Sequence, residues 1–260
     1  MVNKYFTVEV KPFIKASYQA ADSAAYSGDD VLFDWTAIQV PKGASRLISG
    51  TLIHRGVDGA TQTPRDIDIY FAKSINGTAP ATIGNSNATM SALPIVSNHI
   101  IGQLHIESDD GTSASSIDLW NIYQTGSGSS ASMIPACVLE GEPNSGTNVG
   151  YDTIYVAGST GGVLSFGTTV LTRGAVTDDT TLIVETDKGS NDDPNADLIF
   201  AVGDVIHTGT DDVLGTIGSI GAFETNNQPI TFTAPITDDL GDNEELFNVN
   251  PIRLILSFEK

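Results

Sequence analysis

The spacing of short apolar runs constrains this chain more than any other feature, and it is clearest in residues 198–260. There, runs rich in Ile, Val, Phe and Thr end at Gly, Asp or Asn within about ten residues. Short antiparallel strands joined by tight turns have this pattern, because β-branched and aromatic residues suit a pleated surface and Gly, Asp and Asn suit turns. The sequence therefore predicts an all-β protein whose C-terminal part is a small β-barrel followed by one more strand.

Two details give the predicted barrel its shape. Residues 198–207 are expected to form one bent strand, and the turn Gly209–Asp212 is expected to lead into a second strand over 213–220. Gly215 and Gly218 inside that second strand indicate sharp coiling or a close backbone approach, as where a small sheet closes on itself. The strands resemble those of small SH3-like barrels, which implies a shape and no particular activity; the segments that carry the resemblance are 200–206, 214–220 and 230–232.

The rest of the chain shows the same pattern almost from its first residue. Further strands are expected within 5–11, 29–33, 45–54, 66–71, 100–106, 117–123, 153–157 and 169–172. The run Asp66–Phe71 alternates strictly between polar and apolar residues, which predicts one buried face. A single helical turn is expected over residues 89–93. This spacing of strands is typical of a β-sandwich or jelly roll.

The acidic composition argues against nucleic acid as a partner. The chain has 12 Lys and Arg residues against 32 Asp and Glu residues, a formal net charge of -20, whereas nucleic-acid affinity comes largely from basic side chains. No run approaches the roughly 20 apolar residues that a membrane helix needs. Residues 1–11 alternate as a strand does and lack the basic-then-apolar order of a signal peptide. We therefore expect a soluble protein that binds neither nucleic acid nor membranes.

The residues able to bind metals are scattered. The histidines His54, His99, His105 and His207 fall on separate predicted strands or loops, and only His99 and His105 are neighbours in sequence. Their even spacing places those two on one face of a strand but far apart. The acidic stretch 187–197 offers many oxygen ligands but lacks the order of an EF-hand, so we expect a solvated turn, with Ca²⁺ binding as the alternative. Neither a metal nor a cofactor is expected.

Other reactive or aromatic residues have local explanations. Four Asp pairs fall in predicted turns, where Asp caps backbone amides: Asp29-Asp30, Asp109-Asp110, Asp211-Asp212 and Asp238-Asp239. The single cysteine, Cys137, excludes an intrachain disulfide and is expected to be a small buried side chain. Trp35 and Trp120 have apolar neighbours and are expected to anchor the core, with stacking on sugars as the alternative. The sequence contains no Gly-x-Ser-x-Gly, phosphate-loop or His-Glu-x-x-His motif, so we expect no enzymatic activity.

A succession of short segments carries a family resemblance. These segments are 25–32 (AYSGDDVL), 47–53 (LISGTLI), 67–71 (IDIYF) with Asn76, 101–102 (IG), 154–157 (IYVA) and 252–254 (IRL). Together they resemble a group of accessory virion proteins of tailed bacteriophages, in particular marine ones. The resemblance covers most of residues 20–175 and the last strand, and its motifs are loose. It implies a structural part of a phage particle, in the first place a decoration or cement protein on the capsid.

The position of the predicted barrel suggests how the chain is divided. Residues 175–251 precede the last strand and have no counterpart in the simplest proteins of that group, so the barrel fills this gap. Acidic, turn-rich stretches around residue 178 and over 186–197 suit a domain boundary. We expect a β-sandwich or jelly-roll-like domain over 1–176, completed by a strand within 250–260, with an SH3-like β-barrel inserted at 177–249. The alternative keeps the last strand in the barrel.

The expected function is that of a non-enzymatic virion protein. A decoration protein binds the major capsid protein at the capsid surface and stabilises the head. The alternatives are a neck or tail component, or a carbohydrate- or receptor-binding module of a tail. A fibre usually carries repeats or a coiled-coil stalk, and this sequence has neither. Because a capsid lattice is symmetric, we expect a homo-oligomer, in the first place a trimer.

The N-terminal strand is the candidate contact surface. Residues 1–15 carry Lys4, Lys11 and Lys15 against the single acid Glu9, which makes them locally basic in an acidic chain. We expect this strand to meet an acidic surface or a strand edge on a neighbouring subunit, by main-chain pairing helped by charge. The alternative is an ordinary edge strand whose lysines discourage aggregation.

Overall fold

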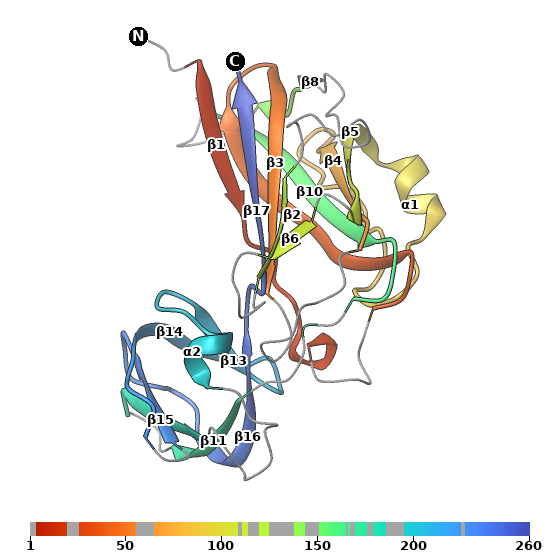
Figure 1. Cartoon of the computed structure of the whole chain (residues 1–260). Helices are drawn as coiled ribbons and strands as arrows, with labels where there is room; N and C mark the ends of the chain where they lie inside the picture. Colours follow the sequence, from red (N-terminus) through yellow and green to blue (C-terminus); the bar gives the residue numbers. More distant parts are fainter. Residues whose placement is uncertain are drawn as a thin grey trace.

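The computed structural model has two β bodies, an upper sandwich and a lower barrel in Figure 1. It describes residues 4–19, 26–55, 65–108, 111–113, 120–124, 138–143, 151–164, 166, 170–175, 179–185, 195–224 and 227–260. Nearly all regular structure in these residues is antiparallel strand, so the prediction of an all-β protein is confirmed. None of the helices among the described residues is long and apolar enough to cross a membrane.

Two antiparallel sheets form the sandwich. The first has the order β1 (Tyr5–Val10), β17 (Ile252–Glu259), β3 (Ser45–Arg55), β7 (Trp120–Gln124) and β6 (Gly111–Ser113), with β8 (Val138–Leu139) paired to β3. The second has the order β2 (Asp30–Pro41), β10 (Tyr151–Thr160), β4 (Ile67–Lys73) and β5 (His99–Ile106), with β9 (Glu142–Pro143) paired to β10. The inner faces of both sheets contribute to one apolar core.

Strict alternation along the strands builds that core. In β4, Ile67, Ile69 and Phe71 are fully buried while the residues between them are partly exposed, so the predicted buried face of this strand is confirmed. In β17, alternate residues are buried in the same way, including Leu254 and Leu256. Alternation thus fixes the register, because a shift of one residue would turn every apolar side chain to the other face.

The barrel is a separate closed sheet with its own core. Its strands are joined in the order β11 (Val170–Ala175), β12 (Thr181–Glu185), β15 (Asn227–Phe232), β14 (Val213–Ile220), β13 (Val205–Thr208) and β16 (Leu240–Asn248), and β16 pairs back with β11. The short helix α2 (Ala196–Ile199) adds Ala196 to the barrel core. No buried residue belongs to both cores, so the two bodies exclude water independently of each other.

The glycines of β14 act as the sequence predicts. Gly215 has φ of +148°, and a Cβ there would lie 3.3 Å from the Phe232 ring, which confirms a close approach. The register shifts once opposite Gly215, between Ile206 and His207 on β13, and again around Gly218, between Ile217 and Ser219. These irregularities bend the strand so that a small sheet can close on itself.

Three expectations about individual elements are wrong. Strand β11 pairs with β12 and β16, so the barrel begins at residue 170 and not at 177; short strands of similar composition do not reveal which sheet they join. Residues 198–207 are not one strand, because α2 and a turn at Gly203, with φ of +94°, precede β13. The predicted helical turn lies slightly later, at α1 (Ala92–Ser97), and the short helices η1 (Ala16–Tyr18) and α2 were not expected.

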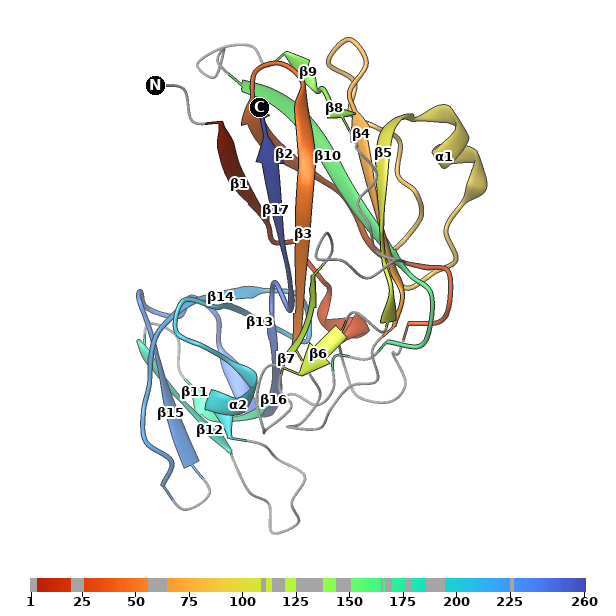
Figure 2. The ribbon, with the colours of Figure 1, turned by 45° about the horizontal axis from the view of Figure 1, so that its top comes forward.

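The final strand leaves the barrel and enters the sandwich. Strand β17 lies between β1 and β3 in the first sheet, as the division at residue 250 expects. Figure 1 shows β16 running upward into β17, with both chain ends at the far end of the sandwich from the barrel. Figure 2 shows α1 beside β4 and β5, on the other side of the sandwich from β1. Only residues 249–251 separate β16 from β17, so the two bodies are joined by a very short link.

The separate cores predict that the sandwich folds without the barrel. Replacing residues 170–248 by a short Gly/Ser linker should leave a protein with β-type circular dichroism and a single cooperative thermal transition, because the buried residues of the sandwich core all lie outside this range. The full-length protein, which keeps the barrel, is the control and should show the same β-type circular dichroism in the far ultraviolet. If the shortened protein is unfolded or aggregates, the two bodies depend on each other for folding.

Candidate functional site

The three lysines predicted to bind a partner do not form one cluster. Lys4 and Lys11 flank β1 at opposite ends, about 23 Å apart for seven residues of extended chain. Lys4 Nζ lies 2.6 Å from Glu259 Oε1, and Lys11 Nζ lies 3.4 Å from Glu9 Oε2. Hydrogen bonding between Lys4 and Glu259 raises the pKa of the lysine and lowers that of the carboxyl. Lys15 is exposed and directly precedes η1. Two of the three charges are therefore already balanced within the chain.

A second feature of the N-terminal strand is the position of β1 at the edge of its sheet. Among the described strands β1 pairs only with β17, so it forms an edge of the first sheet. Its residues alternate between exposed and partly buried as far as Val10, which is buried in the core, and Tyr5 is 58% exposed. The backbone edge rather than the lysine charges is thus what this strand offers to a partner.

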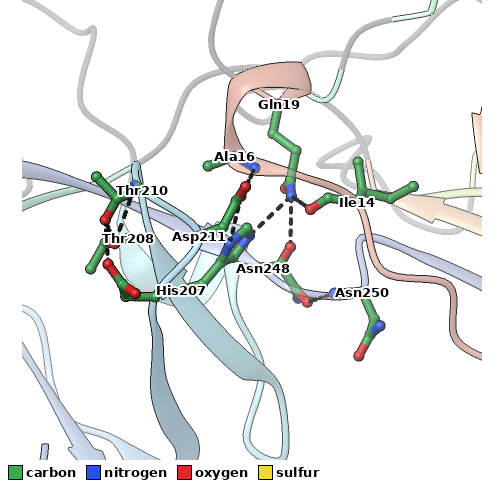
Figure 3. Close-up of polar contacts among 10 residues, drawn as sticks. Ile14, Ala16, Gln19, His207, Thr208, Thr210, Asp211, Asn248 and Asn250 are labelled. Atoms are coloured by element: carbon green, nitrogen blue, oxygen red, sulfur yellow. Dashed lines mark hydrogen bonds and ion pairs between the residues drawn. The ribbon is translucent and has the colours of Figure 1, made fainter. Parts of the chain in front are cut away.

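The contact between barrel and sandwich is built from polar interactions, and Figure 3 shows it in close-up. Three segments meet there: the loop 11–19 from the sandwich, the hairpin tip 207–212 from the barrel, and the link 249–251 with Asn248 at the end of β16. We call this contact the junction. Ile14 donates its backbone N–H to the Val249 carbonyl over 3.1 Å, and Val249 donates to the Val205 carbonyl over 2.8 Å. The link is therefore hydrogen-bonded to both bodies.

Gln19 lies at the centre of the junction. This side chain is 5% exposed, and its Nε2 donates to the carbonyls of Ile14 over 2.7 Å and Asn248 over 2.8 Å. Since carbonyl oxygens only accept hydrogen bonds, these two contacts fix which end of the amide is nitrogen. The same Nε2 lies 3.3 Å from Nε2 of His207. One amide thus contacts all three segments of the junction (Figure 3).

Asp211 holds the hairpin tip against the sandwich loop. Asp211 has φ of +69° in the turn between β13 and β14, and its Oδ1 accepts a 2.7 Å hydrogen bond from the Ala16 backbone N–H. The neighbouring Asp212 makes a contact within the turn, because its Oδ2 accepts from the Thr210 hydroxyl over 2.6 Å, a side-chain donor and not the expected backbone amide. The local interpretation is therefore wrong for Asp211, whose partner is 195 residues away in sequence.

His207 is fully buried beneath this turn. Its Nδ1 lies 3.3 Å from Asp211 Oδ1, within ion-pair distance but without hydrogen-bond alignment. The rings of Phe13 and Phe247 lie 5.6 Å and 6.0 Å from the imidazole. Burial among these groups lowers the pKa of His207, against a smaller opposing effect of Asp211. Burial therefore favours the neutral form of the imidazole.

A groove lies beside the junction. It has a volume of about 300 Å³ and is lined by Lys11 and Arg253 of the sandwich, residues 201–205 and Asn248 of the barrel, and Asn250 and Pro251 of the link. Glu9 forms ion pairs with both Lys11 and Arg253. The two cations on the sandwich wall therefore share one carboxylate and give the groove no strong preference for an anion.

An apolar patch lies on the other side of the sandwich, beside β5. The helix α1 carries Leu93 and Val96, which are 79% and 83% exposed and lie three residues apart on one helix face. Ile75, 52% exposed at the turn Asn76-Gly77, lies near the end of α1, since it lines one groove together with Ser97 and Asn98. A groove of about 210 Å³, lined in part by Ile75 and residues 79–81, adjoins it. We call Ile75, Leu93 and Val96 the α1 patch.

The α1 patch rests on a fixed support. Asn98, just after α1, accepts a 2.7 Å hydrogen bond from the Ala81 N–H and donates to the Ala81 carbonyl over 2.6 Å. Trp35 Nε1 donates to the same carbonyl over 2.8 Å, and its ring packs against the small cluster of Val31, Ile83 and Ala157. Trp35 is therefore a structural anchor, as expected, and its ring is partly buried rather than presented for sugar stacking. The side chain of Trp120 lies outside the described residues.

The remaining histidines lie far from the junction in sequence and differ in their surroundings. His105 Nδ1 lies 2.8 Å from Asp68 Oδ1, and this hydrogen bond raises the pKa of the imidazole. His99 pairs with Lys73 at the start of β5. His54 is fully buried in β3 beside Phe166, and burial lowers its pKa to about 3. Neither of its ring nitrogens has a hydrogen-bond partner among the described residues.

Metal sites are not found among the described residues. No three His, Cys, Asp or Glu side chains gather there in an arrangement able to hold a metal ion. Most of the acidic stretch 187–197, Asp109-Asp110 and Cys137 lie outside the described residues, so the expectations for them stay predictions. Asp30 has the predicted capping role, since its Oδ2 accepts from the Ser27 N–H over 2.7 Å.

Negative charge is concentrated in the barrel. Residues 170–248 contain 16 of the 32 acidic residues but 2 of the 12 basic ones, so this segment carries a formal charge of -14 of the total -20. Such a density favours separation of barrels from one another in solution. The two bodies therefore differ in surface character as well as in core.

Comparisons with known proteins give no family. No family model matches the chain, and no curated protein matches it. A solved structure with some similarity is the crystal structure of the infectious bursal disease virus VP2 subviral particle, at 8% identity and a TM-score of 0.17. The alignment covers 99% of this chain and 42% of that chain, so this chain spans less than half of it. A TM-score this low carries no argument about fold or function.

Gln19 is predicted to contribute strongly to stability. The substitution Gln19→Leu removes the donor for two carbonyls at a buried position and should lower the free energy of unfolding by about 1–3 kcal/mol. Chemical denaturation at pH 7.5 measures this change. Gln103→Leu is the matched control, since the exposed Gln103 amide donates to Asp68 at the surface, and its effect should stay within about 0.5 kcal/mol. Equal effects of the two substitutions would contradict a structural role for the junction.

His54 is predicted to make the protein sensitive to acid. Its pKa is about 3 in the folded protein against 6.5 as the ordinary value, so the unfolded chain binds more protons between these pH values. This contribution to stability is complete above pH 6.5 and falls by about 1.4 kcal/mol for each pH unit below it.

The substitution His54→Leu tests that prediction. It should flatten the fall in stability between pH 6.5 and pH 5 and should raise stability at pH 7.5, because no unpaired ring nitrogen remains buried. Urea denaturation at a series of pH values gives both quantities. His105→Gln is the control for a partly exposed imidazole. If the free energy of unfolding falls with pH equally in wild type and His54→Leu, groups other than His54 determine the sensitivity to acid.

Proposed function

We propose that this protein is a non-enzymatic structural component of a tailed bacteriophage particle, and that it decorates the capsid by binding the major capsid protein. The observation that carries the proposal is the α1 patch, an aliphatic surface on a chain of net charge -20. The resemblance of the sequence to accessory virion proteins names the class of partner. The localisation that follows is the outer surface of the virion head.

The energetics favour a contact role for the α1 patch. Full burial of an aliphatic side chain the size of Val or Leu contributes about 1.5–3 kcal/mol, and Leu93 and Val96 are almost entirely exposed. The hydrogen bonds of Asn98 to Ala81 fix the backbone at the end of their helix, so little ordering cost is left for binding. A rigid apolar projection of this kind fits a complementary hollow on a lattice subunit.

The finer description of the fold belongs to the same proposal. We propose that the two-sheet body is of the jelly-roll-like type, and that the closed barrel is of the SH3-like type. The bulged β14 and the small closed sheet support the second assignment. In this arrangement the sandwich binds the capsid and the acidic barrel covers the surface beside it.

The N-terminal strand supplies a second contact in this proposal. The edge of β1 that pairs with no other described strand can pair with a strand of a neighbouring subunit. Exposed Lys15 adds charge attraction there, and Lys4 and Lys11 exchange their present carboxylate partners for those of the neighbour. Symmetric lattice points then place copies together as a homo-oligomer, with a trimer as the specific expectation.

The double substitution Leu93→Ser with Val96→Ser tests the proposal. It should lower the affinity for capsid shells assembled from the major capsid protein by at least about tenfold, since the lost apolar burial exceeds about 1.4 kcal/mol. Cosedimentation of the purified protein with shells measures the affinity. Because both side chains are exposed, the thermal stability of the variant should equal that of wild type.

A matched control uses Val163→Ser with Val213→Ser, two aliphatic positions that are 58% and 52% exposed elsewhere on the molecule. This control should bind as wild type does. Binding that is unchanged in the Leu93/Val96 variant would remove the α1 patch from the contact, and an absence of binding by wild type would remove the decoration function itself.

A further inference from the structure

The hydrogen bonds of the junction determine which ring nitrogen of His207 carries the proton. The Gln19 amide presents its nitrogen to both the Ile14 and Asn248 carbonyls, so hydrogen atoms and no lone pair face outward from this atom. Both hydrogens of this nitrogen are directed at those carbonyls, so Nε2 of His207, 3.3 Å away, can share one of them at most. Because the amide nitrogen offers no acceptor, this Nε2 must itself carry no proton. The imidazole proton is then on Nδ1, which faces Asp211 Oδ1 at 3.3 Å.

Protonation of His207 is incompatible with this arrangement. A second proton on Nε2 would place two donors against each other at 3.3 Å, with no acceptor between them. Rotation of the Gln19 amide would present its oxygen to His207 but would also face that oxygen toward two carbonyls. Either way the centre of the junction loses hydrogen bonds at a buried site.

The groups around the ring decide whether a charge can be accommodated. Phe13 from the sandwich loop and Phe247 from β16 pack against it, and both are apolar. Gln19 is neutral, and the one charged side chain that faces the ring among the described residues is Asp211. That carboxylate already accepts the Ala16 N–H, so it is shared between the ring and the sandwich loop. Any movement of Asp211 toward a charged imidazole weakens its bond to Ala16.

From this geometry we propose that the junction is a pH-sensitive lock, closed when His207 is neutral and opened when it is protonated, so that acid loosens the barrel from the sandwich. The lock joins the loop 11–19 to the hairpin tip 207–212, while residues 249–251 keep the two bodies connected by covalent bonds. Opening frees relative movement of two separately folded bodies. The inference does not depend on the proposed function.

The lowered pKa of His207 in the closed state sets the direction of the effect. In the open state the imidazole returns toward its ordinary pKa of 6.5, so the open state binds protons more tightly than the closed one. The equilibrium constant for opening then rises up to about tenfold for each pH unit below about 6.5, until the closed state also becomes protonated.

Hydrogen–deuterium exchange on the full-length protein between pH 7.5 and pH 4.5 tests the lock. Protection of the amides in 13–19 and 206–212, corrected for the intrinsic pH dependence of exchange, should fall by up to about tenfold per pH unit. Protection in β4, within the sandwich core, should fall less. His207→Gln, whose amide oxygen can accept from Gln19 at every pH, should keep both segments protected, and His105→Gln should behave as wild type does.

Two outcomes would overturn the proposal: protection of these segments that does not change with pH in wild type, or an unchanged acid response in His207→Gln. Nitrogen NMR of labelled wild-type protein serves as a second measurement if the substitution impairs folding. At pH 7.5 it should show neutral His207 with the proton on Nδ1. A proton on Nε2 instead would contradict the lock.

Discussion

The structure depends on one connection, the passage of the chain from β16 of the barrel directly into β17 of the sandwich. Strand β17 lies between β1 and β3, so the first sheet cannot be completed until the chain has finished the barrel. Only residues 249–251 lie between the two strands, and Val249 is hydrogen-bonded to both bodies. The barrel is therefore an inserted unit whose position is set by a short link and by the polar contacts of the junction, rather than by a shared apolar core.

Sequence patterns predicted the strands well where packing is local. The alternation of Ile67, Ile69 and Phe71, the turn before β14 and the glycines within it all follow from rules that involve neighbouring residues. The junction could not be predicted in this way. Gln19 and Asn248 are 229 residues apart, and Asp211 has the same sequence context as any Asp in a tight turn. The prediction that β11 belongs to the sandwich was wrong for the same reason, since the sheet that a strand joins is a long-range property.

The two bodies differ in a way that suits distinct roles. The barrel segment carries most of the net negative charge, whereas the α1 patch provides exposed aliphatic side chains on the sandwich, beside β4 and β5 (Figure 2). An apolar contact supplies affinity with little dependence on salt, and a charged outer body limits association between neighbours. The junction can change how firmly the barrel is held against the sandwich. Its central imidazole is buried, and its donors and acceptors are matched only when that imidazole is neutral.

The proposal that this protein decorates a phage capsid is tested most directly by counting its copies in purified particles of a bacteriophage whose genome carries its gene. Quantitative mass spectrometry of such particles, with the major capsid protein as the internal standard, gives the ratio of the two chains. Symmetric coverage of the head predicts copies on the order of hundreds, in a simple ratio to the major capsid protein. About a dozen copies or fewer would place the protein at the neck or tail, and its absence from the particle would contradict a structural role in the virion.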